Sequence, residues 1–355
     1  MLFSFGKTKS IVGLDIGSSS VKAVECAVKG KSAELLKVGV APLPAEAIVQ
    51  GAFLNSGAIT EAISEALSSA EIKTKNVATA VSGHSVIVKK ISLPTMTRDE
   101  LEESISWEAE QYIPFDINEV NLDFQIMEGS DVEGQMDVLL VAAKKDLIDD
   151  YVHVITDAGL TASVIDVAAF AVENAFDANY DSDPDEVVAL VNIGSQVVNI
   201  NIIAGGSPAF TRDISTGGSV YTEEIQKALS VSWEEAERIK IGGIGPEESQ
   251  DVVPQEVEDA MRNVTETVLG EISRSLDFFA ATAAESRISR VVLSGGGANV
   301  SGLEAAFQGK TNLPVERFNP FARVTPSAKI DAQFLEEAGP SLAVSLGLAL
   351  RRMDD

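Results

Sequence analysis

Two short segments far apart in the chain repeat one another, and this repeat constrains the fold more than any other feature of the sequence. Residues 14–22 read LDIGSSSVK, and residues 191–199 read VNIGSQVVN. Each follows an apolar run, and the pattern predicts a strand, a tight Gly/Ser turn and a second strand. Glycine permits close approach of the backbone, and small hydroxyl residues add hydrogen-bond donors without bulk. Two such turns facing one another would form a clamp for a chain of phosphates.

The length of the chain predicts two lobes. With 355 residues it exceeds what one simple core usually holds. We place the first lobe at residues 1–185 and the second at residues 186–355, because the acidic loop at residues 181–185 is the best boundary between them. The order of predicted elements supports a duplicated α/β fold, since the second lobe repeats the strand pattern of the first.

Each lobe also carries a predicted insertion. In the first lobe, residues 87–160 have the pattern of a small α+β unit, whose helix begins at Thr97 with a capping box to Glu100 and runs to about Tyr112. In the second lobe, residues 222–288 form a mostly helical insertion, broken by glycine and proline at residues 242–246.

Composition excludes several classes of function. The 54 acidic and 27 basic residues give a formal net charge of -27, which argues against a non-specific binder of nucleic acid or of anionic membranes, because both need a cationic face. The single cysteine, Cys26, excludes internal disulfides and cysteine-cluster metal sites. No segment resembles a secretory signal, and none has the roughly 18–20 apolar residues that span a bilayer. We therefore expect a cytoplasmic protein without direct membrane insertion.

The first repeated turn offers the chemistry of a phosphate and metal site. Asp15 is placed to hold Mg²⁺ through water, since hard cations take carboxylates and keep much of their hydration. The turn itself supplies backbone amides, small hydroxyls and one cation, from Gly17, Ser18, Ser19, Ser20 and Lys22. The alternative is a serine-rich hairpin turn in which Asp15 is satisfied locally.

Three further segments belong to the same predicted site. The second turn contributes Gly194, Ser195 and Gln196, and residues 215–218, with Gly217 and Gly218, open a helix whose N-terminus attracts anions. Between a predicted strand and a helix lie Gly295, Gly296, Gly297 and Asn299, where a ligand can lie against bare backbone.

Glu237 and Lys240 form the fifth element of the predicted site. They are three residues apart on a predicted helix, so they share a face and either pair with one another or contact a ribose and a base. Spacing alone favours a surface ion pair.

Taken together, the motifs and their order along the chain resemble those of the actin, sugar-kinase and heat-shock-70 ATPase superfamily. The resemblance covers a first phosphate motif at residues 15–22, a connecting helix after Asp166, a second phosphate motif at residues 192–196, an adenosine motif at residues 293–299 and a second connecting helix at residues 339–350. It implies an actin-like (ribonuclease-H-like) fold with ATP and Mg²⁺ between two lobes. It also implies that Glu237 and Lys240 contact ribose and adenine.

The insertion at residues 87–160 makes the resemblance more specific, because it points to one branch of the superfamily. It sits where FtsA and PilM proteins carry their subdomain 1C, and residues 107–115, WEAEQYIPF, resemble the signature of the PilM family. The chain also ends soon after the second connecting helix, where FtsA-like proteins append an amphipathic membrane-binding helix. PilM resemblance implies an ATP-binding scaffold of type IV pilus assembly and twitching motility, held at the inner membrane by PilN.

In that family, the cleft between subdomains 1A and 1C binds the cytoplasmic N-terminal tail of PilN. The resemblance further implies a ring or other homo-oligomer below the inner membrane, close to the motor ATPases and the platform. The alternatives are an FtsA-like division protein and a small-molecule kinase of the same fold. The kinase is less favoured, because no aspartate lies in the sequence surroundings that the catalytic base of a sugar kinase would have.

Two positions bear on whether ATP is hydrolysed. The superfamily usually has an aspartate where this chain has Asn192, and an amide cannot supply the negative charge of a carboxylate. Asp166, before the first connecting helix, is the candidate for orienting a water molecule, with a helix N-cap as the alternative. The sequence predicts tight MgATP binding with slow or negligible turnover.

Ser/His catalysis and zinc sites are excluded, because the only histidines, His84 and His153, belong to unrelated segments.

Overall fold

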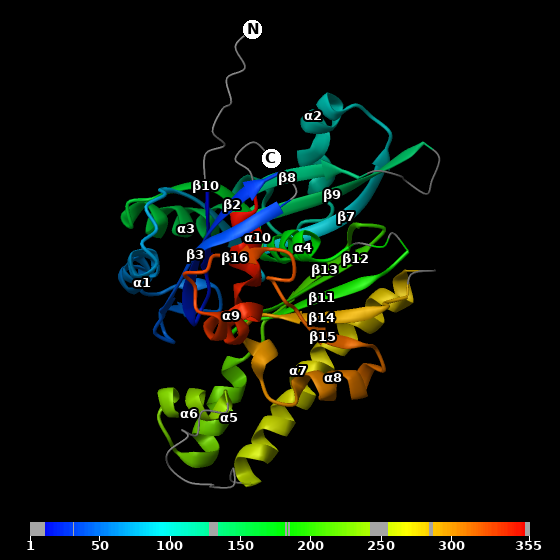
Figure 1. Ribbon diagram of the computed structural model, residues 1–355. Coiled ribbons are helices and arrows are strands. Elements are labelled where there is room, and N and C mark those ends of the chain that lie inside the picture. Colours follow the sequence, from blue (N-terminus) through cyan, green and yellow to red (C-terminus); the bar gives the residue numbers. More distant parts are fainter. Residues whose placement is uncertain are drawn as a thin grey trace.

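The computed structural model describes residues 11–351, except for residues 31, 128–133, 182, 184, 242–254 and 284–286. In this part of the chain, two large β-sheets lie on either side of a pair of central helices, and a smaller sheet with one helix extends from the first of them (Figure 1). None of the described helices is long and apolar enough to cross a membrane.

The first sheet begins with the hairpin that the first repeated segment predicts. Its strand order is β10-β6-β1-β2-β3-β16, in which β1, β2 and β3 are antiparallel and β6 and β10 run parallel to β1. The central strand β1 is almost entirely buried, as expected for a strand covered on both faces. The six strands are β1 (Val12–Ile16), β2 (Ser20–Lys29), β3 (Ser32–Pro42), β6 (Asn76–Val81), β10 (Thr161–Val167) and β16 (Thr325–Pro326).

The second sheet repeats this arrangement. Its order is β13-β12-β11-β14-β15, and the hairpin β11–β12 takes the place of β1–β2. The turns match in detail, because the Gly17 amide donates to Ser20 O at 3.1 Å and the Gly194 amide donates to Val197 O at 2.9 Å. The predicted duplication of strand, turn and strand is therefore confirmed. The strands are β11 (Val188–Ile193), β12 (Val198–Ala204), β13 (Ser207–Ile214), β14 (Arg290–Ser294) and β15 (Val315–Arg317).

A third sheet forms a unit with its own core. Strands β7 (Val86–Pro94), β9 (Gln135–Lys144) and β8 (Val120–Ile126) are antiparallel in that order, and helix α2 (Arg98–Ala109) packs on one face. The capping box between Thr97 and Glu100 is confirmed, with the Thr97 amide donating to Glu100 Oε2 at 2.8 Å. The helix ends earlier than predicted, because residues 110–112 continue as turns.

Helix α3 (Lys145–Asp157) differs from the predicted organisation. It falls inside the predicted insertion at residues 87–160, yet its apolar face, with Tyr151, Val154 and Ile155, is buried in the first core beside helix α1 (Ser56–Ser69). The core of the inserted unit draws only on residues 86–144, which we call the inserted unit below. The outer lobe boundaries stay a prediction.

The helices of the second half agree with the predicted helical stretch. They are α5 (Ser219–Leu229), α6 (Trp233–Lys240) and α7 (Gln255–Thr282), followed later by α8 (Leu303–Thr311). The predicted glycine and proline breaks at residues 242–246 lie outside the described residues. Several short elements had no periodic signal and were not predicted: β4 (Ile48–Val49), β5 (Ala52–Phe53), η1 (Ile117–Glu119) and α9 (Ala332–Ala338).

Two central helices join the sheets. Helix α4 (Ala168–Asn179) and helix α10 (Ala343–Ala349), preceded by η3 (Gly339–Leu342), share one buried cluster with residues from β2, β3 and β6 and from β11, β12 and β14. The contact is close because glycines lie where the backbones cross. A methyl group on Gly347 would lie 1.7 Å from Ala171 O, and one on Gly13 would lie 1.9 Å from Ser345 O. Any larger residue would push these elements apart.

We expect Gly347→Ala to destabilise the protein by about 3 kcal/mol, since the new methyl group overlaps backbone atoms that cannot yield by a rotamer change. Urea unfolding followed by circular dichroism measures this loss. The matched control is Gly309→Ala in helix α8, where an added methyl group meets nothing within 4 Å. It should stabilise the protein slightly, by about 0.5–1 kcal/mol. Equal stability of the two variants would contradict the proposed tight crossing.

Candidate functional site

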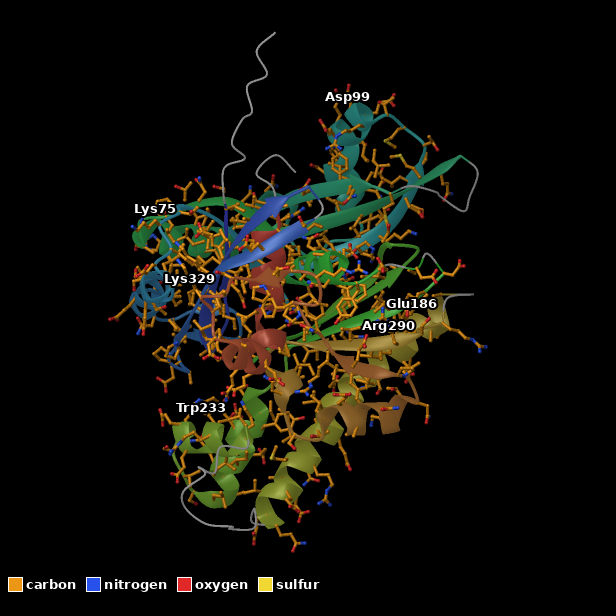
Figure 2. The ribbon with its side chains drawn as sticks, viewed as in Figure 1. Lys75, Asp99, Glu186, Trp233, Arg290 and Lys329 are labelled. Carbon is orange, nitrogen blue, oxygen red and sulfur yellow. The ribbon has the colours of Figure 1, made fainter. Side chains whose placement is uncertain are left out.

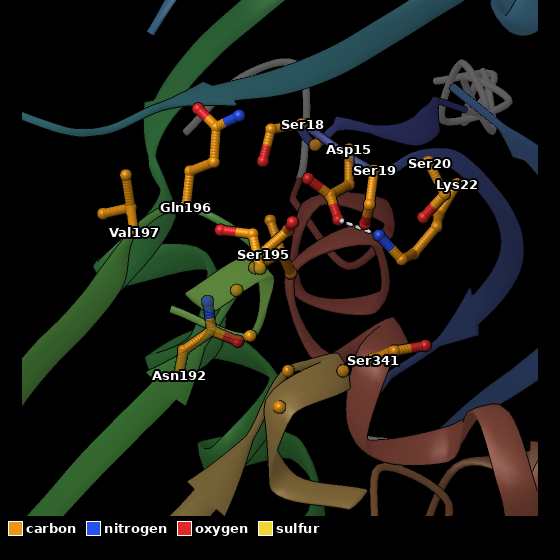
Figure 3. Close-up of a pocket in the computed structure, with 18 of the residues that line it drawn as sticks. Asp15, Ser18, Ser19, Ser20, Lys22, Asn192, Ser195, Gln196, Val197 and Ser341 are labelled. Carbon is orange, nitrogen blue, oxygen red and sulfur yellow. Dashed lines mark hydrogen bonds and ion pairs between the residues drawn. The ribbon is translucent and has the colours of Figure 1, made fainter. Parts of the chain in front are cut away.

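A large cavity lies between the two repeated turns. Its volume is about 2690 Å³, and residues from both large sheets line it. Figure 3 shows the first turn on one side and the second turn, with Asn192 below it, on the other. Sixteen of the eighteen predicted site residues line the cavity, and Asp166 and Gly217 do not.

The first turn presents an ion pair to the cavity. Asp15 and Lys22 are directly opposite one another in the hairpin β1–β2, so their side chains project from the same face of the sheet. Lys22 Nζ lies 3.2 Å from Asp15 Oδ2, and both side chains are largely buried. The three serines of the turn line the cavity next to this pair. Asp15 thus has a local partner, as the alternative interpretation required, and still faces the cavity.

The second turn is fixed by helix α5. The Gly218 amide donates to Gly194 O, and the Ser219 amide donates to Ser195 O, both at 2.9 Å. Gly217 makes this contact possible, since a methyl group there would lie 2.5 Å from both carbonyl oxygens. The structure therefore gives Gly217 a packing role behind the turn.

Gln196 joins the two halves of the cavity wall. Its Nε2 donates to Ile48 O, and its Oε1 accepts from the Gln50 amide, both at 2.9 Å. Ile48 and Gln50 belong to the small hairpin β4–β5 of the first half, so the second turn is tied across the cleft to that hairpin. No pattern in the sequence predicted this bridge, because its partners are separated by nearly 150 residues.

Asn192 takes part in a buried hydrogen-bond chain. Ser294 Oγ donates to Asn192 Oδ1 at 3.2 Å, and Asn192 Nδ2 donates to Asn199 Oδ1 at 2.9 Å. Asn199 Nδ2 in turn donates to Asp213 Oδ1 at 2.8 Å. Both ends of the Asn192 amide are therefore engaged within the protein. Asn199 could have been found from the sequence, because it occupies the place in the second repeat that Lys22 has in the first.

The same chain forms a second bridge across the cleft. The Gly83 amide, which precedes the inserted unit, donates to Asp213 Oδ2 at 2.5 Å. Burial raises the pKa of the Asp213 carboxyl above its ordinary value, although its two hydrogen bonds oppose the shift. The wall of the cavity is thus bonded directly to the loop that leads into the inserted unit.

Glu237 and Lys240 pair with one another and also line the cavity. Lys240 Nζ lies 2.6 Å from Glu237 and donates to Gly218 O and Thr222 Oγ1 as well. Lys240 is buried, so this is not the exposed surface pair that spacing alone favoured. Glu237 and Lys240 can therefore pair with one another and still face the cavity.

The glycine-rich segment has two different functions. A methyl group on Gly295 would lie 2.3 Å from Ile193 O, and one on Gly297 would lie 2.3 Å from Ile193 Cγ2. These two glycines are needed for packing against strand β11, whereas Gly296 has open space where its side chain would be. Asn299, at the end of η2 (Gly296–Asn299), donates from Nδ2 to Glu337 O at 3.0 Å. Only part of the glycine run is therefore available to a ligand.

Asp166 is engaged elsewhere. Arg351 Nε donates to its Oδ2 at 2.8 Å, and burial raises the pKa of the carboxyl. Its side chain does not line the cavity, so the structure does not bring the predicted water-orienting group to the predicted phosphate site. The N-cap alternative is wrong, because the cap of helix α4 is Val167 and lacks a side-chain bond.

Comparison with known proteins points to one family. The sequence pattern of the family described as type IV pilus assembly protein PilM matches residues 13–353. A solved structure described as a PilM-PilN type IV pilus biogenesis complex is 31% identical, with a TM-score of 0.85 over 97% of this chain and 99% of that chain. The cell division protein FtsA of Borreliella burgdorferi is 25% identical over 391 residues, 96% of this chain and 90% of its own.

More distant structures share the fold alone. MreB5 of Spiroplasma citri bound to AMPPNP is 13% identical, with a TM-score of 0.52 over 96% of this chain and 95% of its own. The ethanolamine utilization protein EutJ of Carboxydothermus hydrogenoformans is 17% identical, with a TM-score of 0.56 over 98% and 91%. The expected actin-like, duplicated α/β fold is confirmed.

We expect Gln196→Ala to loosen the cleft, because it removes two hydrogen bonds between its halves. At about 0.5–1.5 kcal/mol for each bond, local opening of the β4–β5 hairpin should become about 5- to 150-fold more frequent. Hydrogen exchange of a peptide spanning residues 47–54 measures this change. Gln125→Ala, on an exposed position of strand β8, is the control and should leave that exchange unchanged. Unaltered protection in the Gln196 variant would show that the bridge does not hold the cleft.

Proposed function

Since the chain belongs to the PilM family of type IV pilus assembly proteins, we propose that it is an ATP-binding scaffold that holds the cytoplasmic N-terminal tail of PilN. The observation that carries the nucleotide half of the proposal is the pair of matching turns facing one cavity. Membership of the family and the similarity to the PilM-PilN complex support the partner.

The cavity residues suit a nucleotide with a phosphate chain. The first turn offers Lys22, serine hydroxyls and backbone amides to the phosphates, and the second turn faces them with Ser195. Gly296 leaves open backbone in the same cavity that Glu237 and Lys240 line, and we infer that a ribose and a base lie there. A fold relative, MreB5, is described as bound to AMPPNP.

Asp15 is the group that would hold Mg²⁺. Magnesium is usually bound by one or two carboxylates together with substrate phosphates, and it keeps several waters. Within the described parts of the chain, no group of three or more His, Cys, Asp or Glu residues could hold a metal by itself. A magnesium ion would therefore depend on Asp15 and on the phosphates, and it would neutralise their charge.

The site is built for binding more than for hydrolysis. The Asn192 amide is bonded at both ends to Ser294 and Asn199, and it carries no negative charge with which to activate water. Asp166, the other candidate, is paired with Arg351 away from the cavity. We infer that bound ATP mainly keeps the two turns, and so the two sheets, in place.

We expect the purified protein to bind MgATP and to release phosphate far more slowly than about 10 per second, the turnover of an ordinary enzyme. Asn192→Asp should raise the rate, because it supplies the missing carboxylate. Lys22→Met should weaken ATP binding at least about tenfold by removing a charge-assisted contact to phosphate. Fluorescence titration with a labelled ATP analogue and a phosphate-release assay measure these effects.

Lys310→Met, at an exposed position of helix α8, is the control for the loss of a lysine and should bind ATP normally. Turnover of the unaltered protein near 10 per second would refute the holding function. Full ATP affinity in the Lys22 variant would place the phosphates elsewhere.

We place the PilN tail between the first sheet and the inserted unit. The sheet of the inserted unit has two apolar faces, and the face turned away from α2 carries Val88 and Val141, which pack against the first core. A short extended segment can add apolar side chains to such a junction. Through this tail the protein would be held at the inner membrane without inserting into it.

A synthetic peptide of the PilN N-terminal tail should bind the protein, and Val88→Asp should weaken that binding at least about tenfold, because it buries a charge beside the tail. Calorimetric titration with and without ATP measures both affinities. Val152→Asp, on an exposed position of helix α3, is the control and should bind the peptide normally. The Val88 variant should still bind ATP; unchanged peptide affinity in it would contradict the location.

The similarity to FtsA keeps a division function as the second candidate. Localisation of a fluorescent fusion at the division septum would favour it. Links to the motor ATPases and the platform, and assembly into a ring, are extensions of the pilus proposal.

A further inference from the structure

One aromatic residue of the motif at residues 107–115, Trp107, does not pack into the fold. Ile113 is buried in the core of the inserted unit, and Tyr112 and Phe115 pack against that core. Their rings also lie beneath cations, with Lys89 Nζ 5.2 Å from the Tyr112 centroid and Lys144 Nζ 4.7 Å from the Phe115 centroid. Trp107, by contrast, is 74% exposed, the highest value among the large apolar residues that the structure describes as exposed.

The position of Trp107 on helix α2 explains its exposure. The helix buries Leu101, Ile105 and Ala109 against its sheet. Trp107 lies on the opposite side, one turn after Glu103 and one turn before Glu110, so these three residues form one line along the surface. Asp99 extends the line by another turn, and it points outward at the edge of the molecule (Figure 2).

The acidic side chains on this line are free of partners. Among the described residues, no ion pair engages Asp99, Glu103 or Glu110. The neighbouring acids are occupied, since Glu102 pairs with Arg98 at 3.0 Å and Glu100 closes the capping box. The outer line of α2 therefore combines an exposed indole with unpaired negative charge.

This combination selects for a cation. An arginine or lysine over an indole face gains a cation–π attraction, and the flanking carboxylates add charge-assisted hydrogen bonds. Nucleic acid and anionic lipid would be repelled. Two copies of the chain meeting symmetrically through this face would oppose carboxylates to carboxylates.

We propose that the outer line of α2, formed by Asp99, Glu103, Trp107 and Glu110, is a docking surface for an arginine- or lysine-rich segment of another protein. The surface is separate from the cavity, since no residue of α2 lines it. It is also separate from the junction proposed for the PilN tail, because α2 covers the other face of the inserted sheet. The inserted unit then offers two faces to two partners.

The test uses the full chain and a synthetic amphipathic peptide of arginine, leucine and alanine, long enough for about five helical turns. The chain has two tryptophans, so Trp233→Phe leaves Trp107 as the only indole reporter. We expect a saturable shift of its emission on titration. A peptide with citrulline in place of arginine keeps the shape without the charge, and it should bind at least about tenfold more weakly.

Calorimetry with variants then locates the contact. Trp107→Ala, and separately the pair Glu103→Gln and Glu110→Gln, should each weaken binding of the arginine peptide about tenfold, with circular dichroism unchanged. Matched controls are Phe278→Ala, which removes another exposed aromatic residue, and the exposed α1 pair Glu61→Gln and Glu65→Gln. Both controls should retain full affinity.

Three results would overturn the proposal. Absence of a saturable Trp107 signal would show that the surface does not bind a basic segment. Equal weakening by the α1 pair would show diffuse attraction to an acidic protein. Sedimentation showing that Trp107→Ala dissociates a dimer would assign the face to a second copy of the chain. None of these results depends on ATP or on the PilN tail.

Discussion

The structure depends on the close crossing of helices α4 and α10 with strand β1. Two glycines remove the side chains at these crossings, and backbone atoms lie where a methyl group would otherwise stand. The cluster built around the crossing draws on both large sheets, so it fixes how one sheet is placed relative to the other. The two repeated turns face a common cavity because this arrangement holds them there. Dense packing of backbone on backbone leaves little freedom for a gradual shift.

The repeat also shows how duplicated geometry can hold different chemistry. Asp15 is opposite Lys22 in the first hairpin, and Asn192 is opposite Asn199 in the second. The same register therefore places an ion pair on one side of the cavity and a pair of amides on the other. The charged pair suits phosphate and metal, whereas the amide pair continues into Asp213 and ends at the loop before the inserted unit. In the proposed function, the first turn serves the ligand, whereas the second turn also connects parts of the protein.

Hydrogen bonds across the cleft connect the second sheet to the β4–β5 hairpin and to the loop that precedes the inserted unit. Gln196 ties the second turn to the β4–β5 hairpin, and Asp213 ties the second sheet to Gly83. Asp213 is held by hydrogen bonds on both carboxylate oxygens, which is how a buried carboxylate avoids a large desolvation cost. The hydrogen-bonded chain that begins at Asn192 in the cavity wall therefore ends at the loop that precedes the inserted unit.

The secondary-structure elements and the repeat follow from short-range features of the sequence. Periodicity, turn residues and the Thr97 capping box are short-range properties, so the strands, most helices and both phosphate-type turns were predicted near their observed positions. The order of the motifs carried the resemblance to the actin-like superfamily, and sixteen of the eighteen predicted site residues line the cavity. The two-residue strands were missed, because they are too short to carry a period.

The partners of the polar groups, by contrast, depend on how the elements pack in three dimensions. Asp166 has the right position in the sequence for a water-orienting acid, but Arg351, from the far end of the chain, takes its carboxylate. Gly217 and two of the three consecutive glycines serve protein packing, and Lys240 is buried beside Gly218 and Thr222. The bridges of Gln196 and Asp213 join residues more than 100 positions apart. Spacing along a chain encodes which residues share a face of one element, whereas the partner across a cleft is set by how whole sheets and helices pack.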